Sequence, residues 1–208
     1  MQDGIDPVEV AQAPYYRTTY LWMLISSFLS LSASLVLSVD AITLAKNSSS
    51  KLFCDINAIV SCGKVASSWQ SNLLGFPNSF IGLICEPVVI TLAVAGLGRT
   101  KFPKWFLKTA LAIYAIGLAF ALWLLSQSFF VIKAFCPWCL VVTISTVTVF
   151  STMLRINLYE NTFNFAQTKH EKVTDFLDKG RDYVVVTAIY SIIVLAIIIK
   201  YGKYFLPN

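Results

Sequence analysis

Long runs of apolar residues without charge dominate the pattern along the chain. Four of them lie at residues 18–39, 109–132, 134–154 and 183–199, and a fifth at 79–97 is interrupted only by Glu86 and Pro87. A helix of about 20 residues, rising about 1.5 Å per residue, crosses a hydrocarbon core of about 30 Å. The pattern therefore predicts five transmembrane helices.

The composition supports a membrane protein and excludes several other classes. Hydrophobic residues make up 57% of the 208 residues and charged residues only 13%, whereas an ordinary soluble domain has roughly 45–50% and about 25%. A soluble chain of this size could not bury so much apolar surface. The mean hydropathy of +0.70 argues against disorder and coiled coil, and the net charge of +5 needs no nucleic-acid partner. We expect membrane lipid as the main surrounding.

The predicted fold is an all-α integral membrane protein, with a four-helix transmembrane bundle and a peripheral fifth transmembrane helix. The expected segments are an N-terminal tail (1–17), the bundle (18–155) with an outer loop (40–78), a connection (156–182) that includes an interfacial helix, the fifth helix (183–199) and a C-terminal tail (200–208). The N-terminal tail carries three acids and one Arg, which is the wrong charge for a signal peptide. We therefore expect residues 18–39 to remain as a span.

Lysine and arginine in the connections predict the orientation. Ten of the sixteen fall on the side of the N-terminus, in the tail and in the connections after the second and fourth spans, and six fall on the other side. Because basic residues favour the cytoplasm, the N-terminus should be cytoplasmic and the C-terminus outside. This places Cys54, Cys62, Cys136 and Cys139 at the outer face, where disulfides can form.

The motif Cys136-Pro137-Trp138-Cys139 is the strongest candidate for chemistry. Two cysteines at this spacing can close a small disulfide, and at a helix N-terminus the macrodipole favours the thiolate that carries out thiol–disulfide exchange. Pro137 suits the first helical turn because its missing N–H is not needed there. A static disulfide is one alternative, and a zinc site built with Cys54 and Cys62 is another, because zinc takes four clustered ligands. Spacing and location favour a redox motif.

The segment between the first two spans carries a family resemblance. It contains Cys54 and Cys62, then Ser67-Ser68, then Pro77-Asn78-Ser79 at the start of the second span. Together with the CPWC motif before the fourth span, this resembles the bacterial branch of the vitamin K epoxide reductase (VKOR) family over residues 18–155. In the other quinone-linked family, the DsbB type, the CxxC motif comes first and the spaced pair second, which is the reverse of the order here.

The resemblance implies a quinone-dependent thiol oxidase that supports disulfide bond formation in a bacterial inner membrane, with its active site on the extracytoplasmic side. Electrons would pass from a partner to Cys54, then from Cys62 to Cys136, and from Cys139 to menaquinone or ubiquinone, without a metal. Vertebrate vitamin K enzymes carry a Tyr four residues beyond the last motif cysteine, where this chain has Thr143. This favours simple quinone reduction over the alternative, vitamin K epoxide reduction.

Many bacterial relatives carry a fused thioredoxin-like domain after the fifth helix. Here the residues after 199 are only KYGKYFLPN. We therefore expect the electron donor to be a separate extracytoplasmic protein of the thioredoxin fold, similar to DsbA. The non-enzymatic alternative is a membrane protein whose four outer cysteines bind a metal.

The quinone site implied by the resemblance lies near the start of the second span. Asn78 would hydrogen-bond a quinone carbonyl, although Asn also commonly caps a helix. Ser67 and Ser68 would support the site or only cap a short helix ending at Trp69. Trp69 and Phe80 could wall the quinone, but aromatic residues at a membrane interface are commonly anchors.

Glu86 is the one acid inside a predicted span of the bundle. An ionisable group there is costly and should face the bundle interior. It lies two turns from Asn78 and so on nearly the same helix face. We expect it either to feed protons to a reduced quinone or to be neutral and hydrogen-bonded to Ser or Thr.

Overall fold

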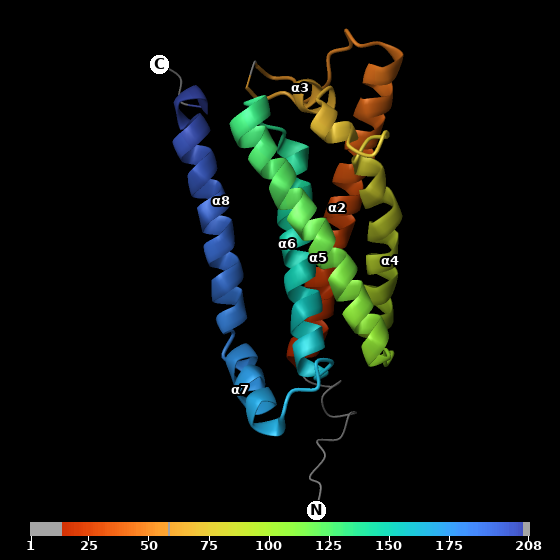
Figure 1. The fold of residues 1–208 in the computed structure, drawn as a ribbon, viewed down its shortest axis with the longest axis vertical. Helices are drawn as coiled ribbons and strands as arrows, with labels where there is room; N and C mark the ends of the chain where they lie inside the picture. Colours follow the sequence, from red (N-terminus) through yellow and green to blue (C-terminus); the bar gives the residue numbers. More distant parts are fainter. Residues whose placement is uncertain (1–13, 58, 206–208) are drawn as a thin grey trace, which may run out of the picture. The chain divides into compact units, whose positions relative to one another are not determined.

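The computed structural model describes residues 14–57 and 59–205, and for Pro14, Tyr15 and residues 203–205 it describes the backbone alone. Most of the predicted N-terminal tail therefore lies outside the described residues. The described elements are helical (Figure 1): α2 (Pro14–Lys46), α3 (Cys62–Ala66), a 3₁₀ turn η1 (Trp69–Asn72), α4 (Ser79–Leu97), α5 (Lys104–Gln127), a π-helical turn η2 (Ser128–Ile132), α6 (Pro137–Tyr159), α7 (Gln167–Asp178) and α8 (Arg181–Phe205).

Five of these helices are long and apolar enough to cross a membrane, which confirms the prediction of an all-α membrane protein. They run over Tyr16–Lys46, Ser79–Leu97, Lys104–Ile132, Pro137–Tyr159 and Arg181–Gly202. The first and third are longer than the charge-free runs because a helix does not end where its first charged residue occurs. α2 continues past Asp40, and α5 begins at Lys104. Charge-free runs mark the apolar part of a span, whereas the backbone sets the helix ends.

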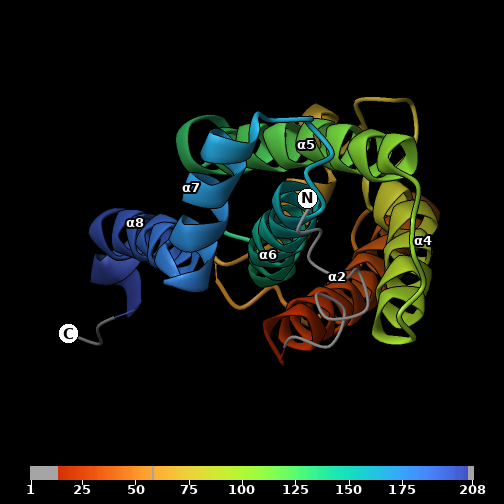
Figure 2. The same ribbon diagram turned by 90° about the horizontal axis from the view of Figure 1, so that it is seen from below.

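The first four spans form one unit, residues 1–162, in which α6 is the most buried. Half of the most apolar stretch of α6 is buried, compared with 28% or less in α2, α4 and α5. α2 packs against both α4 and α6, and α5 packs against α6. Figure 2 shows the resulting order, with α4 beside α2 and α6 between α2 and α5. The core contains residues of all four helices: Tyr20, Met23, Val89, Leu92, Ala93, Leu107, Leu111, Tyr114, Val149, Met153 and Ile156.

Small residues allow α2 and α4 to approach closely. A Cβ added at Gly82 of α4 would collide with the Ser34 side chain of α2. Five serines of α2 are buried: Ser26, Ser27, Ser30, Ser34 and Ser38. The hydroxyl of Ser38 donates to Ser79 Oγ at 2.9 Å. Small side chains and interhelical hydrogen bonds of this kind drive helix association in lipid, where apolar burial gives no driving force.

The second unit, residues 163–208, contains α7 and α8, which contact each other. α7 lies in the predicted connection, where a helix was expected, and its placement at a membrane interface stays a prediction. α8 extends from Arg181 to Phe205, so residues 200–205 of the predicted C-terminal tail continue the helix, and the outer position of this tail stays a prediction. The peripheral position of this helix stays a prediction.

Candidate active site at the cysteine end of the bundle

Two cysteine pairs come together at one end of the four-helix unit, in different redox states. Cys54 and Cys62 form a disulfide that closes the loop between α2 and α3. Cys136 and Cys139 are free thiols. α3, which begins at Cys62, lies at the end of the bundle where α2 ends and α4 begins (Figure 1).

A short backbone bridge brings the two pairs into contact. Val60 and Phe135 form an isolated parallel β-bridge, in which Ser61 N–H donates to Phe135 O at 3.1 Å and Phe135 N–H donates to Ile59 O at 2.6 Å. Cys136 directly follows the bridge residue Phe135, and Cys62 lies two residues after the bridge residue Val60. The Sγ atoms of Cys62 and Cys136 are consequently 3.5 Å apart.

The chain reverses sharply just before the CPWC motif. α5 ends in the π-helical turn η2, and Lys133 after it adopts a left-handed conformation at φ 54° and ψ 38°. A non-glycine residue in this region is uncommon, and π-helical turns occur often at functional sites. The turn places Phe135 in the bridge, and Pro137 then begins α6 at the first helical position, as the sequence predicted.

The start of α6 stabilises a thiolate at Cys136. Cys136 is the N-cap of α6, and its Sγ accepts a hydrogen bond from Cys139 N–H at 3.3 Å. The Cys139 thiol lowers the pKa of Cys136 most, the backbone N–H groups of Cys139 and Trp138 add to this, and together they outweigh burial. A thiol with a lowered pKa leaves faster in exchange. Cys136 is therefore suited to be the sulfur that leaves when a thiolate attacks the cysteine joined to it.

The cysteines lie in an apolar cluster. Cys54, Cys62 and Cys136 are all buried, and Leu52, Val65 and Ala134 pack with them. Asp40 of α2 approaches this cluster, with its Oδ2 atom 3.8 Å from Cys54 Sγ. Beside the buried Cys54, the side chain of Phe53 is 99% exposed. The loop therefore shields the disulfide but presents an apolar side chain next to Cys54.

Asp55 ties the two ends of the disulfide loop together, and sequence reasoning did not find it. Its Oδ1 accepts hydrogen bonds from Ser61 Oγ at 2.7 Å and from Gly63 N–H at 2.9 Å, and its Oδ2 accepts from Leu52 N–H at 3.0 Å. Burial would raise the pKa of the Asp55 carboxyl, but these hydrogen bonds outweigh it and hold that pKa below its usual range. Asp is common in loops, so its identity alone gave no signal.

Asn78 does not cap α4 with its side chain, although it occupies the N-cap position. Its Nδ2 instead donates to Gln70 O at 2.7 Å, while its Oδ1 is buried without a hydrogen-bond partner. Which amide atom is O and which is N follows from the hydrogen bonds. Asn78 Oδ1 is therefore a buried acceptor to which a hydroxyl or N–H group of a ligand can donate.

The other residues expected near the quinone lie in the same segment but differ in their surroundings. Ser67 follows α3 as its C-cap, and the Ser68 hydroxyl donates to Val65 O at 2.6 Å. The short helix ends at Ala66 and not at Trp69, because the chain changes to the 3₁₀ turn there. Trp69 is 64% exposed and meets the Trp123 ring edge to face at 6.3 Å. Phe80 stacks on Phe76 at 6.4 Å.

Glu86 faces the bundle interior, as its cost in lipid requires. It is 4% exposed, and its Oε1 accepts hydrogen bonds from Ser30 Oγ at 2.7 Å and from Tyr114 Oη at 3.0 Å. Its Oε2 is buried without a hydrogen-bond partner. The structure therefore has the expected hydrogen bond to a serine and adds Tyr114, which sequence reasoning missed because it lies 28 residues away on another helix.

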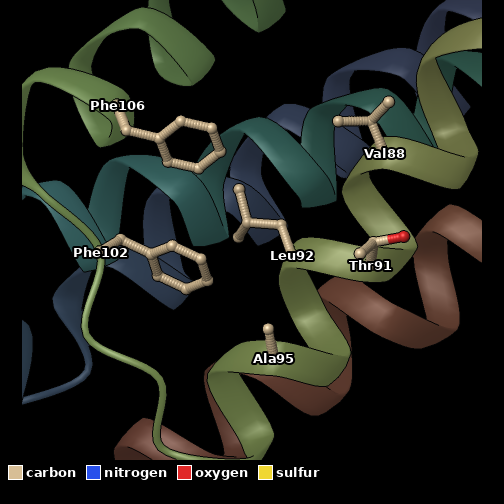
Figure 3. A pocket seen from close by; sticks show the side chains of 6 residues that line it. All are labelled: Val88, Thr91, Leu92, Ala95, Phe102 and Phe106. Atoms are coloured by element: carbon tan, nitrogen blue, oxygen red, sulfur yellow. The ribbon is translucent and has the colours of Figure 1, made fainter.

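An apolar cavity of about 240 Å³ lies between α4 and α5, toward the end of the bundle away from the cysteines. Figure 3 shows the side chains that line it: Val88, Thr91, Leu92, Ala95, Phe102 and Phe106. Thr91 is the only polar residue among them, and its hydroxyl donates to Pro87 O at 2.8 Å. None of the residues expected to bind quinone lines this cavity.

Comparison with known families agrees with this geometry. The model of the vitamin K epoxide reductase family matches residues 21–154, which is more than half of the chain. The chain therefore belongs to the vitamin K epoxide reductase family. No curated protein matches it. Membership implies an oxidoreductase of the thiol and quinone type, embedded in a membrane through several spans and linked in general to disulfide formation.

Proposed function

We propose that the protein oxidises a reduced extracytoplasmic partner of the thioredoxin fold and passes the electrons to a membrane quinone, in a bacterial inner membrane. The observation that carries this proposal is the contact of 3.5 Å between Cys62 Sγ and Cys136 Sγ. It joins a loop disulfide to a second cysteine pair at a helix terminus inside the bundle. Two pairs in contact can relay two electrons by thiol–disulfide exchange.

Each exchange step forms one disulfide and breaks another. A partner thiolate attacks Cys54 and releases Cys62 as a thiolate. Cys62 then attacks Cys136 in the Cys136–Cys139 disulfide and releases Cys139. The partner's second thiolate completes the partner's own disulfide and releases Cys54, which attacks Cys62 and frees Cys136. The result is an oxidised partner, an oxidised loop and a reduced CPWC pair, which is the redox arrangement of this structure.

A quinone is the final electron acceptor. It takes up two electrons and two protons when the CPWC pair closes to a disulfide. The residues at the start of α4 fit such a ligand. Asn78 Oδ1 is a buried acceptor without a partner, and buried polar groups in proteins are nearly always satisfied, so the hydroxyl of a reduced quinone can donate to it. In this proposal the Nδ2 hydrogen of Asn78 that Gln70 O does not use donates to a quinone carbonyl. Ser67 and Ser68 shape the loop beside it, and Trp69 and Phe80 wall the site.

The environment of Glu86 supports a neutral acid with one free oxygen. The hydroxyls of Ser30 and Tyr114 both donate to Oε1. Oε1 therefore acts as the carbonyl oxygen of a protonated carboxyl group, and Oε2 carries the proton. An unpaired carboxylate would be very costly at this depth. Glu86 in this proposal holds a proton inside the bundle that a reduced quinone can take.

Two other functions are less well supported. The metal-binding alternative needs thiolates. The sulfurs of Cys54 and Cys62 and one oxygen of Asp40 lie within 4.8 Å of one another, but the two sulfurs are joined in a disulfide.

Vitamin K epoxide reduction is the second alternative, and for it the position of the vertebrate Tyr matters. This chain has Thr143 there. Its hydroxyl donates to Cys139 O at 2.9 Å and is buried, so it is engaged with the backbone.

The proposal is tested with purified protein and a reduced DsbA-like partner. Partner oxidation beyond what the protein's own disulfides supply should proceed only when menaquinone or ubiquinone is added, and this sustained turnover should stop in the Cys136→Ser variant. Vitamin K epoxide in place of quinone should give no turnover. Sustained partner oxidation without quinone would contradict the proposal, and so would stoichiometric zinc that binds to the reduced protein and is lost on substitution of the four cysteines.

Substitution of Asn78 by Ala should weaken quinone use. Losing a hydrogen bond to a buried group costs about 1–3 kcal/mol, or about 5- to 150-fold in kcat/KM for quinone. The KM for the partner should not change. Asn72→Ala is the matched control, because the Asn72 amide also donates to backbone oxygens of this segment, those of Ala66 and Ser68, but is exposed. Equal quinone kinetics in the two variants would limit Asn78 to a structural role.

A further inference from the structure

Two of the contacts that hold the disulfide loop have different consequences when the disulfide opens. The β-bridge between Val60 and Phe135 fixes the part of the loop that carries Cys62 against Cys136. It does not involve residues 52–55, which carry Cys54. Once the Cys54–Cys62 bond is broken, the bridge therefore keeps Cys62 in place but leaves Cys54 to other contacts.

The Asp55 side chain joins the part of the loop that carries Cys54 to the part that carries Cys62. Asp55 directly follows Cys54, and its carboxylate accepts hydrogen bonds from Ser61 Oγ and Gly63 N–H, on either side of Cys62. It also accepts from Leu52 N–H on its own side of the loop. Hydrogen bonds to an ionised carboxylate are about twice as strong as neutral ones. None of these contacts requires the disulfide to be closed.

Gly63 makes this arrangement possible because its missing side chain lets the Asp55 carboxylate approach the backbone closely. A Cβ at residue 63 would lie 2.9 Å from Asp55 Oδ2 and 3.3 Å from Oδ1. The carboxylate is held by three hydrogen bonds, so it could not move aside without losing some of them. A side chain at residue 63 would therefore displace the carboxylate without removing its charge.

We propose that Asp55 is a positioning residue that keeps Cys54 next to Cys62 while the loop disulfide is open, and so drives its closure. This inference rests on the proposed relay, in which Cys54 must return to attack Cys62 after each partner leaves. Holding two reacting groups in place raises their effective concentration. A higher effective concentration of Cys54 at Cys62 shifts the loop toward its oxidised form and speeds the step that frees Cys136.

The equilibrium of the loop disulfide tests the inference without quinone or partner. Cys136 and Cys139 are both replaced by Ser, so that only the loop pair exchanges, and the oxidised fraction is measured in mixtures of reduced and oxidised dithiothreitol by thiol alkylation and mass spectrometry. In this background Asp55→Asn should lower the equilibrium constant for disulfide formation by about tenfold, since the neutral amide loses the charge-assisted bonds. Asp55→Glu, which keeps the carboxylate, should recover part of this loss.

Two further variants separate positioning from general damage to the loop. Gly63→Ala should lower the equilibrium constant in the same direction as Asp55→Asn, although it keeps the Asp55 carboxylate. Asn57→Ala is the matched control, because Asn57 Oδ1 also accepts from two backbone N–H groups, at Ile59 and Val60, but both lie on the Cys62 side. It should leave the constant within about twofold of the parent.

The inference is overturned if Asp55→Asn leaves the constant within that same margin, or if Asn57→Ala lowers it as much as Asp55→Asn does. Because neither quinone nor partner is present, these outcomes do not depend on the proposed function. In the protein with all four cysteines, Asp55→Asn should lower kcat for partner oxidation while the KM for quinone stays constant. A change confined to the quinone KM would also contradict the proposed role.

Discussion

In a protein with Ser in place of both Cys54 and Cys139, Cys62 and Cys136 should form a disulfide rapidly and almost completely when the thiol oxidant diamide is added. Their Sγ atoms are already 3.5 Å apart, held by a backbone bridge that needs neither of the substituted residues. Two sulfurs held in contact react with a very high effective concentration. Peptide mass spectrometry without reduction identifies the bond, and diamide takes up the two electrons.

The matched control exchanges which loop cysteine remains. A protein with Ser in place of Cys62 and Cys139 keeps Cys54 and Cys136. Its disulfide should form at least about tenfold more slowly, because the bridge between Val60 and Phe135 holds Cys62, and not Cys54, against Cys136. Cys85 is present in both proteins and is a free thiol within α4. Equal rates in the two proteins would show that the contact between Cys62 and Cys136 does not select the route between the pairs.

The spans could be predicted from the sequence because lipid imposes a simple rule. A segment in the hydrocarbon core must be apolar and helical, so charge-free runs locate it. The boundaries were less accurate, as in α2, which continues beyond Asp40 to Lys46. Charge marks the edge of the apolar core, whereas the helix ends where its backbone hydrogen bonding ends.

Parts of the candidate site could be predicted for local reasons. The CPWC motif at the start of α6 follows from the preference of proline for the first helical turn, and the structure has Pro137 there. The distance between Cys62 and Cys136 does not follow from local rules. It depends on a backbone bridge between Val60 and Phe135, and backbone pairing over 75 residues of separation leaves no residue-type signal.

The polar contacts of the interior were also beyond the sequence. The cost of a charge in lipid predicts that Glu86 faces inward, but its donors Ser30 and Tyr114 come from two other helices. Either residue would be unremarkable by itself, since serines are common in α2 and tyrosines are common at membrane interfaces. Ser30 and Tyr114 become the donors only because the packing of α2, α4 and α5 brings them to the same level of the bundle as Glu86.

The proposed partner of the thioredoxin fold should react with Cys54 and not with Cys62. Cys54 is the more exposed of the two, at 6% against 1%, and it follows Phe53, whose side chain is 99% exposed and available to a partner. Cys62 is instead the first residue of α3, follows the β-bridge by two residues and contacts Cys136. A docked partner can therefore approach Cys54 by displacing little of the loop, whereas Cys62 is covered.

The comparison uses two proteins that each keep one loop cysteine, with the other loop cysteine and both CPWC cysteines replaced by Ser. The probe is a DsbA-like partner with a single active-site cysteine, activated as a mixed disulfide with thionitrobenzoate. Attack by a loop thiolate joins partner and protein through a disulfide and releases coloured thionitrobenzoate, which reports the rate. The protein that keeps Cys54 should react at least about tenfold faster, because the rate of exchange depends on access to the attacking sulfur.

Phe53→Ala should slow this reaction but not the reaction with a small thionitrobenzoate disulfide. A faster reaction at Cys62 would reverse the assigned order of the loop cysteines and leave the contact between Cys62 and Cys136 without its role in the relay.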